Sequence, residues 1–288
     1  MGTNLDRAPP KFYKMNGAGN EILVLDLRGD TLALDAEDIR AIADAPGFGF
    51  DQLMALRSSG TPEVDAVMEI FNRDGSRSAA CGNGTRCVAA LVMNETGATK
   101  LQLQSDAGIL PVWRGADKSI TVDMGEPQFR WDEIPLAEPF HDLRAIELQI
   151  GPIDAPILHS PTVVGMGNPH AIFWVEDADA FDLGQLGPLI ENHPIFPERA
   201  NVSLAEVVNS SRIRLRVWER GAGLTRACGS AACAVGVAGA WTNRTERDVA
   251  IELPGGELQI EWRADNHVLM TGPWELERSG NLELETSG

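Results

Sequence analysis

The sequence predicts an α+β fold of two pseudo-symmetric domains, each a strand-rich sheet or barrel wrapped around a central buried helix. Strand-like segments dominate, helical segments are few, and one cysteine-containing motif occurs twice. It reads Ala-Cys-Gly-Asn-Gly around Cys81 and Ala-Cys-Gly-Ser-Ala around Cys228, and 228 − 81 = 147 residues separate the two cysteines. Gly-Asn pairs at 19–20 and 167–168 keep almost the same spacing. A spacing that several motifs share indicates a duplicated domain.

Strands are predicted where short runs of β-branched and aromatic residues are bounded by Gly, Pro, Asn or Asp. These runs lie at residues 21–26, 66–72, 100–104, 119–123, 171–176, 212–219, 248–253 and 258–263. An acidic start predicts a helix over 34–43, capped by Asp35 or Asp38. Two more helices are predicted at 82–94 and 229–241. Because Ala and Val occur on all their sides, we expect both to be buried.

A proline-rich segment, residues 126–156, lies between the two halves and lacks clear periodicity in its first part. We place the domain boundary near residue 130. This gives an N-terminal domain of residues 1–129 and a C-terminal domain of residues 130–274. A chain of 288 residues is long enough for each domain to bury its own core.

The composition narrows the class of partner. A net charge of −18 argues against nucleic acid or an anionic membrane, since both favour clustered Lys and Arg. No apolar run approaches the roughly 18 residues that a membrane-spanning helix needs, and the first residues lack the apolar region of a secretory signal. We therefore expect a cytoplasmic protein whose four cysteines are thiols.

The repeated cysteines point to acid–base chemistry. Each stands at the start of a predicted helix, where free N–H groups and the helix dipole favour a thiolate and lower the thiol pKa. Gly82 and Gly229 would let a substrate carboxylate approach the same N–H groups. Inverting an α-carbon needs a base on one face and an acid on the other, which two thiols supply. Cys81 and Cys228 therefore predict a racemase or epimerase.

Cofactors and metals are not expected. The sequence shows no strong pyridoxal phosphate or nicotinamide motif. The spacings Cys-x5-Cys from Cys81 to Cys87 and Cys-x4-Cys from Cys228 to Cys233 differ from those of ordinary zinc sites. We expect Cys87 and Cys233 to pack in the core.

Polar residues accompany both cysteines. Asn72 and the pair Glu219–Arg220 end predicted strands, where binding groups often lie. Glu or Asn can receive an ammonium group, and Arg220 can hold a carboxylate through two hydrogen bonds. Other candidates lie beside glycine, proline or strand starts: Asn20, Asn168, Asn201 and, in a supporting role, His170. Simpler interpretations stay open, namely turn chemistry for Asn72 and an exposed ion pair for Glu219 and Arg220.

Both cysteine motifs match the pattern of a known family, together with Asn-Pro-His at 168–170 and Leu-Pro-Gly-Gly at 253–256. Further matching segments follow the family's order over nearly the whole chain, at residues 14–20, 71–76, 201–202 and 219–226. Through these segments the chain resembles the diaminopimelate epimerase family, pyridoxal-independent enzymes that interconvert LL- and meso-diaminopimelate in lysine and peptidoglycan precursor synthesis.

The resemblance implies roles for individual residues. Cys81 and Cys228 would be the two acid–base thiols. The reacting carboxylate would be held by residues at the helix starts: Gly82, Asn83, Gly229 and Ser230. Near the reacting amino group would lie Asn20, Gln52 and Glu219. The distal amino acid end of the substrate would be held by Asn72, Asn168, Asn201 and Arg220.

The resemblance also implies a diaminopimelate epimerase-like fold that closes over the substrate. Residues 275–288 would return to the first domain, and the protein would be a homodimer. Three residues depart from the family's pattern: Asn16 stands where His is usual, Ala171 where Cys is common, and Trp218 where Tyr is usual. Trp274 is also unexpected.

Two alternative functions remain. A proline racemase-type or hydroxyproline epimerase would share the fold and the two thiols. Arg220 and the asparagines favour a substrate with a second charged amino acid group, which a proline-sized pocket has no use for. The other alternative is a non-catalytic amino-acid-binding protein whose cysteines only pack.

Overall fold

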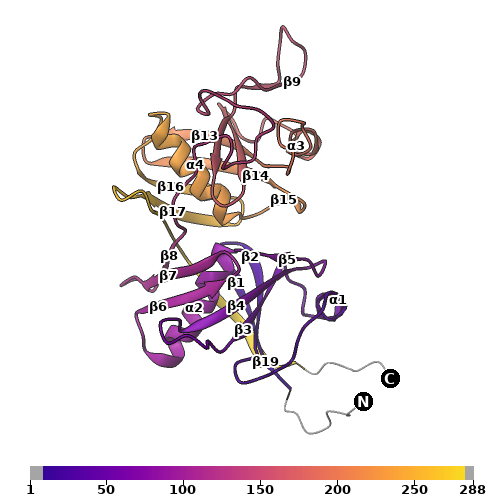
Figure 1. Cartoon of the computed structure of the whole chain (residues 1–288), viewed down its shortest axis with the longest axis vertical. Coiled ribbons are helices and arrows are strands. Elements are labelled where there is room, and N and C mark those ends of the chain that lie inside the picture. The colour runs from indigo at the N-terminus through magenta and orange to yellow at the C-terminus, as the bar shows by residue number, and fades with distance from the viewer. Residues whose placement is uncertain (1–8, 283–288) are drawn as a thin grey trace. The chain divides into compact units, whose positions relative to one another are not determined.

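The structure, a computed structural model, describes residues 9–282 and contains two compact units (Figure 1). Unit 1 holds the residues up to Ile120 and those from Pro273 onward, and unit 2 holds Thr121–Gly272. The predicted boundary near residue 130 therefore falls inside unit 2. The reason is that β8 (Ile120–Asp123) pairs with β18 (Val268–Gly272). Residues 1–8, and 283–288 of the segment predicted to return, lie outside the described residues.

Unit 1 is a single sheet with a helix on each face. Its strands lie in the order β19–β1–β2–β3–β4–β6–β7, with β5 beside β4. The bounds are β1 (Lys11–Gly17), β2 (Asn20–Asp26), β3 (Gln52–Arg57), β4 (Ala66–Asn72), β5 (Arg77–Ser78), β6 (Lys100–Ser105), β7 (Gly108–Arg114) and β19 (Glu275–Asn281). The helices are α1 (Ala36–Asp44), between β2 and β3, and α2 (Gly82–Thr96), between β5 and β6.

Unit 2 repeats this plan. Its main strands lie in the order β11–β12–β13–β14–β16–β17–β18–β8, with β15 beside β14. The bounds are β11 (Thr162–Gly165), β12 (Pro169–Val175), β13 (Asn201–Asn209), β14 (Arg212–Glu219), β15 (Gly223–Thr225), β16 (Asp248–Leu253) and β17 (Gly256–Trp262). Helix α3 (Leu183–Glu191) lies between β12 and β13, and α4 (Gly229–Trp241) between β15 and β16. A small separate pair is formed by β9 (Gln149–Ile150) and β10 (Leu158–His159).

The strand directions show the duplication most clearly. From β1 to β7, neighbouring pairs are antiparallel, parallel, antiparallel, parallel and antiparallel. From β11 to β17 the same five senses recur in the same order. Each buried helix follows the short strand beside the fourth strand of its series. The predicted fold class, a strand-rich α+β unit around a central helix that occurs twice, is confirmed.

Local sequence explains the helix boundaries. Cys81 and Cys228 are the extended N-cap residues of α2 and α4, and Gly97 ends α2 in the left-handed conformation at φ 75°. The prediction of a helix over 229–241 is confirmed, and α2 runs two residues further than predicted. Asp35 caps α1 and exchanges hydrogen bonds with Asp38, which is a capping box. Helix α3 was not predicted, and Pro188 lies inside it.

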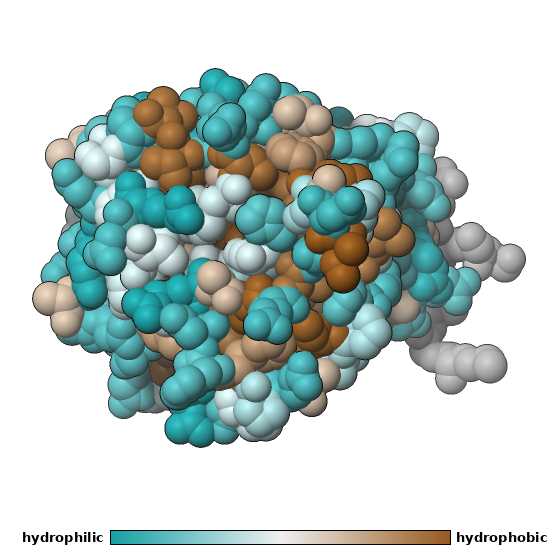
Figure 2. Space-filling view, turned by 90° about the horizontal axis from the view of Figure 1, so that it is seen from above, coloured by the Kyte–Doolittle hydropathy of each residue, from teal (hydrophilic) through white to brown (hydrophobic). Residues whose placement is uncertain are grey.

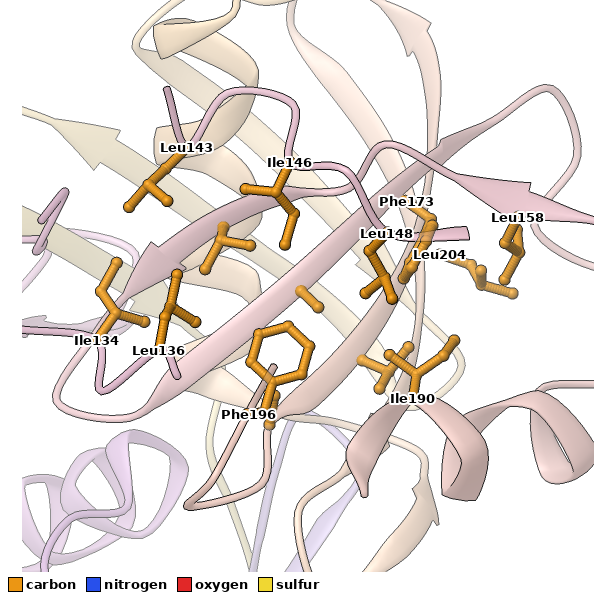
Figure 3. Packing of buried hydrophobic residues seen from close by; sticks show 14 of the residues in the cluster. Ile134, Leu136, Leu143, Ile146, Leu148, Leu158, Phe173, Ile190, Phe196 and Leu204 are labelled. Carbon is orange, nitrogen blue, oxygen red and sulfur yellow. The ribbon is translucent and has the colours of Figure 1, made fainter. Parts of the chain in front are cut away.

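The central strands of each sheet, β2 and β3 in unit 1 and β12 and β13 in unit 2, are buried on both faces. In β2, Leu23 and Leu25 pack against Ile39 and Ile42 of α1. The alternate residues of β2 point to the opposite face, where α2 contacts the sheet. In unit 2, Leu204 of β13 belongs to the equivalent cluster (Figure 3), which also includes residues of α3 and of the irregular segment before β9. Cys87 and Cys233 are fully buried in α2 and α4, as predicted.

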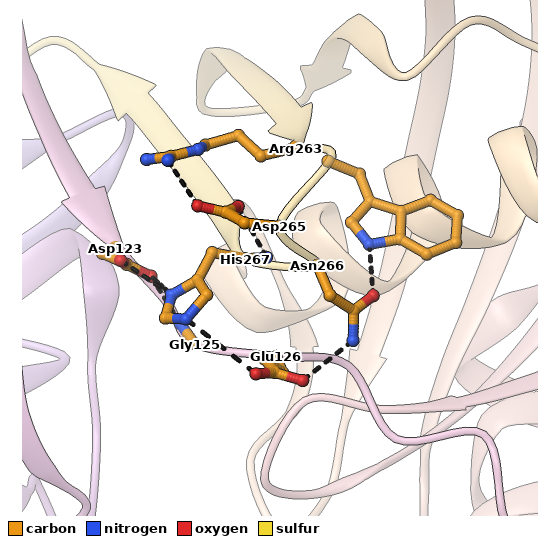
Figure 4. A network of polar contacts seen from close by, with 8 residues as sticks. Asp123, Gly125, Glu126, Arg263, Asp265, Asn266 and His267 are labelled. Atoms are coloured by element: carbon orange, nitrogen blue, oxygen red, sulfur yellow. Dashed lines mark hydrogen bonds and ion pairs between the residues drawn. The ribbon is translucent and has the colours of Figure 1, made fainter.

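Figure 4 shows side chains that link the turn before β18 to the end of β8 and the residues just after it. His267 Nδ1 lies 2.9 Å from both carboxylate oxygens of Asp123, and the hydrogen bond and negative charge of Asp123 raise the pKa of His267. Asn266 donates to Glu126 at 2.9 Å and accepts from the indole of Trp262 at 3.0 Å. These contacts explain why the chain joins unit 2 at Thr121 and not near residue 130.

The surface carries separated apolar residues. Ile153 in the β9–β10 turn is 88% exposed, and Leu189 on α3 is 59% exposed. Figure 2 shows hydrophobic patches that are interrupted by hydrophilic residues. Scattered apolar side chains are usual on a folded protein, so none of them marks a site by itself.

Candidate active site

The structure divides the predicted site residues between the units. Unit 1 contains Asn20, Gln52, Asn72, Cys81, Gly82 and Asn83. Unit 2 contains Asn168, His170, Asn201, Glu219, Arg220, Cys228, Gly229 and Ser230. In each unit they gather at the cysteine-capped end of the buried helix and at neighbouring strand ends. The two groups are called the Cys81 half-site and the Cys228 half-site below.

Cys81 is held by the start of α2. The backbone N–H of Gly84 donates to Cys81 Sγ at 3.2 Å, and the Cys81 carbonyl accepts from both the N–H and the hydroxyl of Thr85 at 2.8 Å. A Cβ at Gly84 would lie 2.6 Å from Met54 Sδ and 3.3 Å from Cys81 Sγ. Glycine is therefore needed for the N–H to reach the sulfur. An N–H that donates to sulfur favours the thiolate.

Two side-chain oxygens of the Cys81 half-site are buried and lack a partner among the described residues. They are Oδ1 of Asn20, at the start of β2, and Oδ1 of Asn83, in the first turn of α2. Asn83 is only 2% exposed. Buried polar atoms are nearly always paired in folded proteins. Two unpaired acceptors in the half-site of one thiol are typical of a site that a ligand completes.

Gln52 and Asn72 lie directly opposite each other on β3 and β4. Gln52 Nε2 donates to Asn72 Oδ1 at 3.1 Å, and Asn72 Nδ2 donates to Ser76 Oγ at 3.0 Å. Asn72 also begins a tight turn in which Gly75 has φ 88°. Asn72 therefore both stabilises this turn and belongs to the Cys81 half-site.

Cys228 differs from Cys81. Its thiol is buried, and its Sγ lies 3.5 Å from Ser230 Oγ. Burial raises the pKa of the Cys228 thiol well above its usual value, and the negative charge of Glu219 raises it further. The prediction that the helix start lowers the pKa is therefore wrong for Cys228. Loss of water around the thiolate outweighs the helix dipole and the Ser230 hydrogen bond.

Glu219 is fixed beside this thiol. It is the last residue of β14, and its Oε1 accepts a hydrogen bond from Thr225 Oγ1 at 2.6 Å. Thr225 lies on β15, which pairs with the end of β14. The residues that follow β15 begin α4 at Cys228, so a short hairpin brings the carboxylate and the thiol together.

Asn168 and His170 form a second pair in unit 2. His170 Nε2 lies 2.8 Å from Asn168 Oδ1, and His170 is fully buried. Burial lowers the pKa of His170 to about 3, and the charge of Arg220 acts in the same direction. The neutral ring therefore donates from Nε2 to Asn168, which leaves the buried Nδ1 as an acceptor without a partner among the described residues.

Asn201 holds the loop after β14. Its Oδ1 accepts from the backbone N–H of Arg220 at 3.0 Å, and its Nδ2 donates to the Pro169 carbonyl at 3.1 Å. The Arg220 guanidinium donates to the carbonyl of Glu198 at 3.1 Å. The structure thus gives Asn201 a clear part in fixing Arg220, which sequence analysis did not predict.

Within residues 9–282, no group of three or more His, Cys, Asp or Glu side chains is arranged to hold a metal ion. The helices of this same range are also too short or too polar to cross a membrane. The four cysteines are thiols.

The profile of the family described as diaminopimelate epimerase matches residues 12–130 and 162–277. Diaminopimelate epimerase of Methylobacterium sp. (strain 4-46) is 61% identical over 281 residues, which cover 96% of each chain. The chain belongs to the diaminopimelate epimerase family. The protein of that name from Afipia carboxidovorans is 59% identical over 271 residues, which cover 93% of each chain.

Solved structures with little sequence identity share the fold. A hydroxyproline epimerase from Agrobacterium vitis has a TM-score of 0.69 at 14% identity, with 98% of this chain and 94% of that chain covered. A phenazine biosynthesis protein from Enterococcus faecalis has a TM-score of 0.64 at 15% identity, with 96% and 100% covered. The diaminopimelate epimerase family therefore shares this two-unit fold with proteins of other names.

The departures from the family's pattern are hydrogen-bonded locally or packed in the core. Asn16 Oδ1 accepts from the N–H of Gly19 at 2.7 Å and so closes the β1–β2 turn. Ala171 is buried in the core of unit 2. The indole of Trp218 donates to Glu191 at 2.7 Å, and that of Trp274 donates to the Lys118 carbonyl at 3.0 Å. None of these residues replaces a group that the diaminopimelate epimerase resemblance assigns to chemistry.

Proposed function

We propose that this chain interconverts LL- and meso-2,6-diaminopimelate by a two-base mechanism, for lysine and peptidoglycan precursor synthesis. Membership of the diaminopimelate epimerase family supports the substrate. The observation that carries the mechanism is that both units cap their buried helix with a cysteine, Cys81 or Cys228, beside unpaired or charged polar groups.

In this mechanism one sulfur is the base and the other the acid. A thiolate takes the α-proton, and the electron pair of the C–H bond passes into the α-carbon and its carboxylate. The second thiol then delivers its proton to the opposite face of that carbon. The products are the inverted amino acid, a thiol where the thiolate was, and a thiolate where the thiol was. The reverse reaction exchanges these roles.

The half-sites differ in a way that suggests their resting states. Cys81 Sγ accepts an N–H from Gly84, whereas Cys228 is buried beside Glu219 with a raised pKa. We propose that Cys81 is the thiolate and Cys228 the thiol before substrate binds. This form would convert the stereoisomer whose α-proton faces Cys81.

The remaining predicted residues would bind the substrate. The helix-start N–H groups suit the reacting carboxylate and the charge that develops on it: those of Gly82, Asn83, Gly229 and Ser230. The carboxylate of Glu219 and the side-chain oxygen of Asn20 suit the reacting ammonium group, with Gln52 nearby on β3. We assign the distal amino acid end to Asn72, Asn168, Asn201 and Arg220, with His170 in support through Asn168.

We further propose that the reaction needs no cofactor and that the protein is a cytoplasmic homodimer. Two thiols supply both proton transfers, so the chemistry itself calls for no electron sink. Thiol cysteines are those of a reducing compartment. The dimer is an expectation from the family resemblance.

A substrate comparison tests the proposed function. The protein is incubated with LL-diaminopimelate and, separately, with L-proline and trans-4-hydroxy-L-proline, and the stereoisomers are separated by chromatography. We expect conversion of diaminopimelate alone, because Arg220 provides for a second charged end. Faster conversion of either proline would instead support the racemase alternative. Binding of diaminopimelate without conversion would support the binding-protein alternative.

A further inference from the structure

Glu191 is a buried carboxylate outside the predicted site. It is the last residue of α3 and is 5% exposed. Its Oε2 accepts from the indole N–H of Trp218 at 2.7 Å. Its Oε1 accepts from the backbone N–H of Gly221 at 2.9 Å and from the Arg199 guanidinium at 3.3 Å. A buried charge with one cation and two N–H donors is well compensated.

The position of Trp218 is fixed by close packing. A Cβ on Gly187 of α3 would lie 2.4 Å from the indole Cγ. A Cβ on Gly223 would lie 3.5 Å from the other end of the ring. Because Gly187 has no side chain, the indole packs directly against the backbone of α3. Its N–H points to Glu191, one turn further along the same helix.

Gly221 belongs to the turn that carries Glu219 and Arg220. Three consecutive backbone N–H groups of this turn have acceptors: that of Arg220 donates to Asn201 Oδ1, that of Gly221 to Glu191 Oε1, and that of Ala222 to the Glu219 carbonyl. Gly221 has φ 77°, which favours glycine. The turn therefore depends on two side chains from elsewhere, Asn201 and Glu191.

We propose that Glu191 is a positioning residue, which holds Trp218 and Gly221 on either side of Glu219 and Arg220 and thereby orients these two groups for substrate. The inference rests on the proposed function of Glu219 and Arg220. Trp218 and Gly221 directly flank this pair in sequence, so both ends of the short segment are tied to one carboxylate. A charged acceptor makes these ties stronger than a neutral one would.

Glu206 provides a matched control. It also lies in unit 2 as a part-buried carboxylate, with its side chain 18% exposed. It accepts from the backbone N–H of Ala178 at 3.2 Å and from the Arg214 guanidinium at 3.3 Å. It thus shares two kinds of partner with Glu191, a backbone N–H and a guanidinium, but neither partner adjoins a proposed substrate-binding residue.

The test compares Glu191→Gln, Trp218→Phe and Glu206→Gln with the unsubstituted chain, by steady-state kinetics with LL-diaminopimelate, by amide hydrogen exchange and by thermal unfolding. Loss of a charged hydrogen bond changes an equilibrium by roughly 10-fold or more. We expect Glu191→Gln to raise KM by about that factor and to speed exchange in residues 219–223. Trp218→Phe, which keeps an aromatic side chain but removes the indole N–H, should shift both in the same direction by less. Glu206→Gln should shift neither.

Two outcomes would overturn the inference. One is that Glu191→Gln and Glu206→Gln lower the melting temperature alike and leave KM unchanged. The other is that exchange in residues 219–223 does not respond to Glu191→Gln. If the unsubstituted chain fails to convert diaminopimelate, the proposed function fails instead, and the exchange measurement alone still decides whether Glu191 holds the turn.

Discussion

The carboxylate of Glu219 lies beside the buried thiol of Cys228 and disfavours its ionisation. Thr225 holds this carboxylate in place through a 2.6 Å hydrogen bond. A thiol that stays protonated can act as an acid, and it can become a base once the charge around it changes. A substrate ammonium group next to Glu219 would make such a change, because it would offset the negative charge that now raises the pKa of Cys228.

Replacing Glu219 by Gln is expected to lower the pKa of Cys228. Burial remains the larger cause of the raised pKa, so the thiol should still titrate above its usual range. The measurement is the ultraviolet absorbance of the thiolate against pH. It is made in a Cys81→Ser background so that the thiol of the other half-site does not contribute. An unchanged or higher midpoint in the Gln variant would mean that Glu219 does not act on Cys228.

His170 is expected to make stability depend on pH. Its pKa is about 3 in the folded chain against the usual 6.5, so the unfolded chain takes up the proton first as pH falls. The contribution of His170 is complete above pH 6.5 and is lost between pH 6.5 and about 3. The loss approaches about 1.4 kcal/mol per pH unit. Urea unfolding at several pH values should show a weaker dependence for His170→Gln, and parallel curves would contradict this.

Gly75→Ala is expected to destabilise unit 1 by roughly 2 kcal/mol or more, through backbone strain and overlap together. Gly75 has φ 88°, and a Cβ there would lie 2.6 Å from the Ala36 carbonyl oxygen. Gly97→Ala is the control, since Gly97 has φ 75° but has no atom within 4 Å of the added Cβ. Thermal unfolding should show the larger loss for Gly75→Ala. Equal losses would mean that the contact with Ala36 relaxes freely.

Much of the fold could be predicted because the duplication leaves clear signals. The apolar composition of residues 229–241 and the cysteine before them predict α4 correctly. The same spacing that pairs the cysteines also relates α1 and α3, whose first residues are 183 − 36 = 147 positions apart. Applying this spacing to α1 would have located α3. Composition alone does not indicate α3, because Pro188 and two glycines inside it are poor helix formers.

The predicted site residues can be found from the sequence around them, whereas the residues that hold them in place cannot. Asn72 and Glu219 end strands beside the cysteine turns, which sequence spacing reveals. Glu191 lies far from Gly221 in sequence and meets it only because α3 packs against β14 and β15. The raised pKa of Cys228 likewise depends on burial in the folded unit, which a motif does not contain.

The central claim is that each unit supplies one acid–base thiol, and solvent deuterium tests it most directly. LL-diaminopimelate is incubated in heavy water with the unsubstituted chain, with Cys81→Ser and with Cys228→Ser, and the deuterium content and configuration of the α-carbon are followed. Proton transfer by one positioned acid–base group typically raises the reaction rate roughly 100- to 10,000-fold. We therefore predict that the unsubstituted chain inverts the centre with uptake of deuterium and that each variant loses inversion by such a factor. Near-normal inversion by either serine variant would contradict the two-thiol mechanism.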